Sequence, residues 1–87
     1  MSIKDTYLTA VQEAKEARRK EDKAYNERTD ARNRWFRNTT EENLATYQYM
    51  EDNYTMAKNT AETKEILAKR ARLAYWKDTI SKPPEDR

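Results

Sequence analysis

The most regular feature of the chain is an apolar position that recurs every seven residues through its first third. The members of this repeat are Ile3, Ala10, Ala17, Ala24 and Ala31, and the complementary positions three or four residues away hold Tyr7, Ala14 and Trp35. A seven-residue apolar repeat of this length predicts a helix with one narrow seam for a neighbouring helix. Because alanine dominates the seam, we expect the two helices to approach closely and to bury little apolar area per turn.

A second repeat of the same period occupies the other half of the chain. It comprises Tyr47, Tyr54, Ala61, Ala68 and Tyr75, with Met50, Ala57, Lys64 and Ala71 at the complementary positions. When the chain is folded back about residues 38–40, the two repeats meet in one register. Representative pairs place Tyr7 opposite Ala71, Ala17 opposite Ala61, Arg28 opposite Met50, and Ala31 opposite Tyr47. We therefore predict an all-α fold, an antiparallel two-helix coiled-coil hairpin.

Capping residues give the expected bounds of the two helices. Ser2 with Asp5 forms an N-cap pair, so the first helix is expected over about 2–37. Asn38 is expected to take the left-handed position that ends a helix, and Thr39 with Glu42 to cap the second. The second helix is expected over about 40–80, within a single hairpin domain of 1–82. Pro83 and Pro84 open a tail, 83–87.

The composition supports continuous helix and a small core. The chain has 87 residues, no Gly, no Cys and no His, and 39% of its residues are charged. A chain of this size has a small core and is commonly reinforced by a disulfide, a metal or a second copy. Since Cys and His are absent, self-association is the reinforcement that remains.

Charges are distributed unevenly between the two halves. Residues 13–37 hold nine Lys/Arg and six Asp/Glu, whereas 38–65 hold two and six. The hairpin register sets these segments side by side, which favours the antiparallel pairing. Glu21, Arg28 and Lys64 lie in the seam itself. We expect them to extend outward and fix the register, the alternative being a polar patch that awaits a partner.

Several large apolar residues lie outside the predicted seam. Ile66, Leu73 and Ile80 are seven residues apart on another face, and Trp76 flanks them. At the hairpin tip, four neighbouring residues combine aromatic and basic side chains, namely Arg34, Trp35, Phe36 and Arg37. Exposed apolar patches of this kind mark interfaces. We predict a homodimeric four-helix bundle, with a foreign protein partner or a local contact within the hairpin as alternatives.

The sequence offers no set of residues for catalysis. His and Cys are absent, no Gly-rich phosphate loop exists, and adjacent carboxylates point about 100° apart on a helix. We therefore expect no enzyme activity, no cofactor and no metal site.

A basic stretch in the first helix raises the question of nucleic acid. Its cations are Lys15, Arg18, Arg19, Lys20 and Lys23, and carboxylates at 16, 21 and 22 interrupt them. Helical spacing pairs Glu16 with Lys20, which favours a solvated helix face over phosphate binding. Nucleic-acid contact is the competing hypothesis.

The N-terminal residues lack the apolar core of a signal peptide, and no apolar run approaches the roughly 20 residues of a membrane span. We expect a soluble, cytoplasmic protein that does not insert into a membrane. In general character the chain resembles the small helical accessory proteins of tailed bacteriophages. That resemblance implies a module that binds and regulates one host or phage protein, in host defence or lysis. A structural assembly component is the further alternative.

Overall fold

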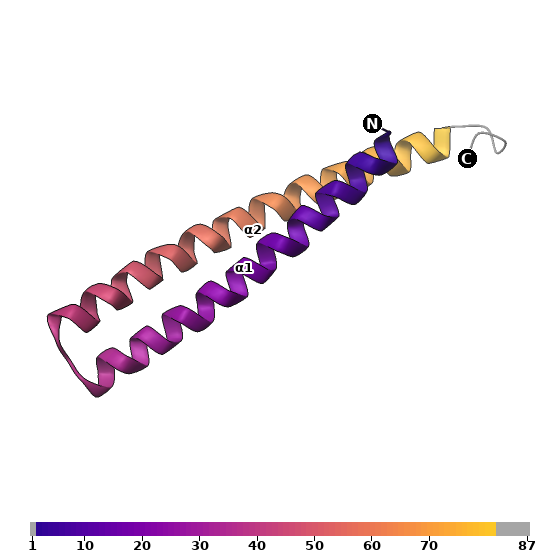
Figure 1. Ribbon diagram of the computed structural model, residues 1–87. Helices are drawn as coiled ribbons and strands as arrows, with labels where there is room; N and C mark the ends of the chain where they lie inside the picture. Colours follow the sequence, from indigo (N-terminus) through magenta and orange to yellow (C-terminus); the bar gives the residue numbers. More distant parts are fainter. Residues whose placement is uncertain (1, 82–87) are drawn as a thin grey trace.

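The computed structural model describes residues 2–81, which form two long antiparallel helices (Figure 1). Helix α1 spans Ile3–Arg37 and helix α2 spans Glu41–Ser81. The predicted all-α hairpin is confirmed. The molecule is a rod of 67 × 17 × 13 Å, and its radius of gyration of 19.6 Å far exceeds the roughly 12 Å of a compact domain of this length. The predicted tail, 83–87, lies outside the described residues.

Helix α1 begins at the predicted cap. The backbone N–H of Asp5 donates to the side-chain oxygen of Ser2 over 3.1 Å, and the backbone N–H of Thr6 donates to the Ser2 carbonyl. These bonds satisfy donors that the first turn of a helix leaves without a partner. At the other end, Arg34 and Arg37 place positive charge in the last turn, where the helix dipole favours it.

The turn corrects two details of the expected capping. Asn38 is extended, with φ −143° and ψ 95°, and not left-handed. Its carbonyl accepts from the Asn43 side chain over 2.7 Å, so a local side-chain bond stabilises the turn in place of a left-handed cap. The cap of α2 is Thr40 and not Thr39, because the Thr40 hydroxyl accepts from the backbone N–H of Asn43. The Thr39 hydroxyl instead donates back to the Trp35 carbonyl.

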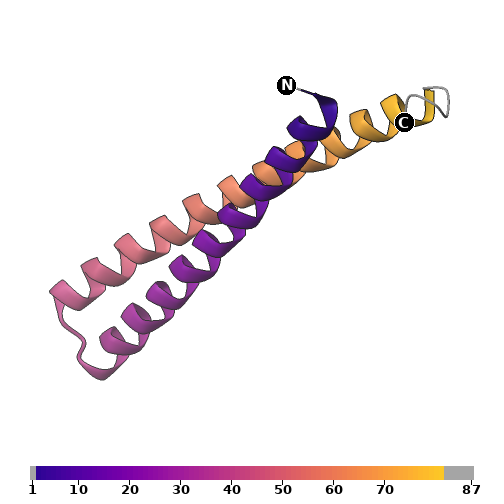
Figure 2. The ribbon, with the colours of Figure 1, turned by 45° about the vertical axis from the view of Figure 1, so that its right-hand side comes forward.

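Alanine forms the buried part of the seam. Among the described residues, the buried apolar side chains are Ala14, Ala17, Ala31 and Ala61. Ala61 is 0% exposed, so the surface of α1 lies directly against its methyl group. Small side chains allow two helices to come close, and they also limit the apolar area removed from water. The two helices cross near the termini in both views (Figures 1 and 2).

Aromatic pairs hold the seam toward its two ends. Near the termini, Tyr7 stacks on Tyr75 with ring centroids 5.5 Å apart and planes 12° from parallel. Near the turn, Trp35 stacks on Tyr47 at 6.0 Å and 24°. Such pairs contribute about 0.5–1.5 kcal/mol beyond the area they bury. Aromatic stacking therefore stabilises both ends of the seam, and packed alanines fill the part between them.

Three of the observed ring contacts lie one helical turn from the predicted pairs. Tyr7 stacks on Tyr75, Arg28 lies over Tyr54, and Tyr47 stacks on Trp35. In each case the contact is displaced by four residues. In a coiled-coil seam, a side chain inserts between two residues of the facing helix that are one turn apart. When the larger of these two residues is aromatic, the inserted side chain makes its ring contact with that residue.

We predict that Ala61→Leu destabilises the hairpin by about 1–3 kcal/mol, because three added carbons have no room against α1. Thermal unfolding followed by far-UV circular dichroism measures the loss. The matched control is Ala74→Leu on the same helix, where the side chain is exposed; it is expected to shift stability by less than about 0.5 kcal/mol. Equal effects of the two changes would contradict a tightly closed seam.

Candidate interaction surfaces

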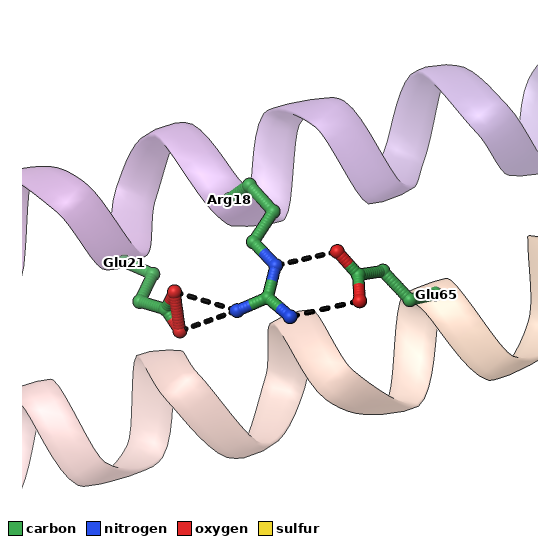
Figure 3. Close-up of polar contacts among 3 residues, drawn as sticks. All are labelled: Arg18, Glu21 and Glu65. Carbon is green, nitrogen blue, oxygen red and sulfur yellow. Dashed lines mark hydrogen bonds and ion pairs between the residues drawn. The ribbon is translucent and has the colours of Figure 1, made fainter.

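The strongest polar contact of the hairpin centres on Arg18. Its guanidinium donates to both carboxylate oxygens of Glu65 on α2, through Nε over 2.5 Å and Nη2 over 2.8 Å. The remaining terminal nitrogen, Nη1, donates to both oxygens of Glu21, one turn along α1, at 2.6 and 2.7 Å. Figure 3 shows the guanidinium between the two carboxylates, with a parallel two-nitrogen contact to Glu65, the bidentate arrangement that gives such pairs their geometric specificity. Arg18 thereby joins the two helices.

This contact shifts the ionisation of both cross-helix partners. The hydrogen bonds from Arg18 lower the pKa of Glu65 below its ordinary value. The bond to Glu65, followed by the bonds to Glu21, raises the pKa of Arg18 further above its usual range. Both side chains of the cross-helix pair are more than a third exposed, so solvent screens their attraction. Glu21 is the more enclosed acid, with a side chain only 13% exposed.

The other two charged seam residues also contact the hairpin itself. Lys64 donates to Glu13 across the helices over 3.1 Å. The guanidinium carbon of Arg28 lies 5.1 Å from the ring centre of Tyr25 and 4.6 Å from that of Tyr54. The two rings meet edge to face at 5.7 Å, and a cation above such rings is attracted to their electron-rich faces. Charge in the seam therefore serves contacts within the chain.

The structure divides the basic stretch of α1. Arg18 is held by two carboxylates, and Arg19 pairs with Glu16 at 3.0 Å. Lys15 lines one shallow groove of the hairpin together with Arg18 and Arg19, whereas Lys20 lines another, beside Glu16 and Lys64. Lys23 is exposed on α1. Two of the five cations are therefore paired with carboxylates, and nucleic-acid binding stays a prediction.

At the tip, the four predicted residues separate into internal and outward-facing groups. Trp35 is half-buried because it stacks on Tyr47. Phe36 rests against Trp35 at 5.2 Å, yet 65% of Phe36 is exposed. Arg34 and Arg37 are exposed beside it. The tip thus exposes the Phe36 ring, which packs on Trp35 and is flanked by the cations of Arg34 and Arg37. Aromatic residues and Arg are both enriched in protein contact surfaces.

The C-terminal part of α2 carries the larger apolar surface, which we call the C-terminal strip. Its members Ile66, Leu73, Trp76 and Ile80 are 50–63% exposed. Leu73 and Trp76 line a shallow surface depression together with the basic residues Lys69 and Arg72. All four predicted residues therefore lie at the surface, on one end of one helix, and positive charge borders them.

The exposed apolar surface of α2 extends beyond the C-terminal strip. Tyr49 and Met56 are 63% and 68% exposed, and they are seven residues apart. Neither residue belongs to the tip or to the C-terminal strip that the sequence predicted. The available signal was that Tyr49, Met56 and Thr63 share one helical position, next to the position that Ile66 and Leu73 share.

Within residues 2–81, no cluster of three or more potential metal ligands is present. No described helix combines the length and apolarity needed to cross a membrane. Comparisons with protein-family models, with curated proteins and with solved structures find no match for this chain. The candidate sites therefore rest on the geometry of the hairpin alone.

The Arg18–Glu65 contact predicts a pH dependence of stability. Because the pKa of Glu65 is lowered by folding, its contribution is complete above the ordinary carboxyl value of 4.5 and is lost as the pH falls through the lowered pKa. Glu65→Gln removes this contribution at every pH. The difference in melting temperature between the native chain and Glu65→Gln should be largest near pH 7 and should shrink below about pH 4.

Glu62→Gln is the matched control, since it removes one exposed carboxylate of the same helix and leaves Arg18 untouched. Its melting temperature should differ less from that of the native chain at pH 7. A gap between the native chain and Glu65→Gln that stays constant from pH 7 to pH 3 would show that the carboxylate charge is not the stabilising element.

Proposed function

We propose that this protein is a non-enzymatic protein–protein interaction module. The observation that carries the proposal is the contrast between its core and its surface. The buried apolar side chains of the described residues are four alanines, whereas eleven large apolar side chains are exposed by 43% or more. Folding of one chain leaves these groups in water, and association with another protein surface removes them from it.

The extent of the surface supports the same proposal. The accessible area is 6890 Å², compared with about 5,400 Å² for a compact globular protein of 10.4 kDa. A rod-shaped hairpin has more surface per residue than a sphere, and its long faces suit contact along a partner. Such a module acts by occupying a surface, so it requires no catalytic group.

Within this proposal, the two contact surfaces are the tip and the C-terminal strip. A regulator of the kind found among phage accessory proteins uses one of them to cover a functional surface of a host or phage protein. Host defence and lysis are the processes that this class of role implies. The chain itself acts as a homodimer, as its thin core and open apolar surface favour.

Phe36→Ala tests the tip as a partner-binding surface. The exposed ring supplies most of the apolar contact there, so its removal should weaken capture of the native partner at least tenfold while far-UV helicity is unchanged. Quantitative pull-down with mass spectrometry from the native host identifies the partner and measures the loss. Trp76→Ala is the equivalent change in the C-terminal strip.

Gln12→Ala, on the exposed surface of α1, is the control and should capture the partner as the native chain does. If neither Phe36→Ala nor Trp76→Ala reduces capture, the assignment of these two surfaces is wrong. If both variants lose helicity, the residues are structural, and Phe36→Leu then tests whether the ring itself is needed.

Nucleic-acid binding predicts a different result in solution. If the exposed lysines of α1 contacted phosphates, affinity would fall steeply with salt, by about tenfold per phosphate contact for each tenfold rise in salt concentration. We expect a filter-binding titration of single- and double-stranded DNA and RNA to stay flat at low salt. Saturable binding that Lys15→Gln and Lys23→Gln both weaken would support the nucleic-acid hypothesis instead.

A further inference from the structure

A continuous stripe of exposed residues runs along α2 on the side away from α1. Starting at Glu42, its positions follow at alternating intervals of three and four residues as far as Ile80, and every one of them is exposed. We call this series the outer stripe. Its large apolar members are Tyr49, Met56, Ile66, Leu73 and Ile80. Intervals of three and four are the pattern of a second coiled-coil seam.

We propose that the outer stripe binds the outer stripe of a second copy of this chain, with the two α2 helices antiparallel. The inference rests on the proposed function, in which exposed apolar residues are contact surfaces, and it names the occupant of one of them. Figures 1 and 2 show that α1 lies along one side of α2. Thr63 of the outer stripe comes two residues after the buried Ala61, and two residues turn an α-helix by about 200°, so the stripe lies on the opposite side.

The register follows from pairing four of the five large apolar members of the stripe with one another. When Asn59 lies opposite Thr63 of the second copy at the centre, Met56 lies opposite Ile66 and Tyr49 opposite Leu73. The two-fold axis repeats each of these pairs on the other side. Apolar residues then meet apolar residues at four levels, and this register overlaps the stripe over its full length. From Glu42 to Ile80 that length is about 57 Å of helix.

Charge supports the antiparallel direction. Residues 41–62 contain five carboxylates and one Lys, whereas residues 63–77 contain five Lys/Arg and one Glu. An antiparallel pair sets the acidic half of one α2 beside the basic half of the other, and a parallel pair would set like charges together. In the proposed register Asp52 lies opposite Arg70 of the second copy. A charged pair at a seam position specifies register and orientation.

The same charge division argues against an anionic membrane surface as the occupant. The basic C-terminal strip suits such a surface, but the acidic half of the stripe would be repelled by it. A second copy uses both halves. It also gives an architecture different from a compact four-helix bundle, because each α1 lies on the far side of its own α2. The four helices form a row, with the two α2 helices at its centre.

Charge reversal at one proposed pair tests the register directly. Asp52→Arg places two cations opposite each other in the homodimer, and Arg70→Glu places two carboxylates there. By sedimentation equilibrium or light scattering, the native chain should be a dimer, and each variant should dissociate at least tenfold more readily. When the two variants are mixed, every reversed pair is again complementary, so a one-to-one heterodimer should form at the native affinity.

Both substituted residues are exposed, and far-UV circular dichroism should show native helicity for each variant. Lys23→Glu, a charge reversal on the exposed surface of α1, is the matched control and should leave the dimer intact. Lys77→Glu tests the register one heptad away, in which Asp52 lies opposite Lys77. Heterodimer formation between Asp52→Arg and Lys77→Glu, but not with Arg70→Glu, would overturn the proposed register.

Three other results would overturn the proposal itself. These are a native chain that is monomeric at about 100 μM, a native dimer that both charge reversals leave unchanged, and a monomer that binds vesicles containing phosphatidylserine. The outcomes also separate this inference from the proposed function. A monomer that captures its partner through Phe36 contradicts only the dimer, and a dimer that captures nothing contradicts only the partner.

Discussion

The close approach of α1 and α2 at Ala61 is the constraint on which the rest of the structure depends. With its methyl group fully enclosed, Ala61 brings the two helix surfaces together, and Ala14 and Ala17 continue the contact on α1. The hydrophobic stabilisation of a seam scales with the apolar area it buries, and alanine buries little. The hairpin consequently needs additional contacts, and it has them at both ends and at the rim of the seam.

Those additional contacts are of two chemical kinds. Aromatic stacking of Tyr7 on Tyr75 and of Trp35 on Tyr47 closes the ends, where the seam has no alanine pair. Between them, Arg18 joins Glu65 to Glu21 and crosses from one helix to the other. Each contact contributes little free energy when it is exposed to solvent, but together the contacts fix which residues face one another. Charge here specifies the pairing more than it stabilises the fold.

A thin seam has a direct consequence for the surface. Because alanines occupy the interior, the larger residues such as Leu73, Trp76 and Phe36 have no place between the two helices. Helix α2 is affected most, since it carries apolar residues on the side facing α1 and on the opposite side as well. A helix that is apolar on two opposite sides is suited to a position between two neighbours. The architecture of one chain supplies only one of them.

The sequence by itself determined the two helices, their antiparallel pairing and the alanine seam, because a seven-residue repeat is a one-dimensional property of a helix. It also placed Ser2 at the first cap, where one side chain and one nearby backbone N–H suffice. The tertiary structure alone decided that Thr40 and not Thr39 caps α2, and that Asn38 is extended, because the Asn43 side chain returns to the turn. It alone revealed that Arg18 is committed to Glu65, since the partner is 47 residues away and several cations compete for it. The sequence shows which residue types are present, but which of them remain at the surface depends on how closely the two helices pack.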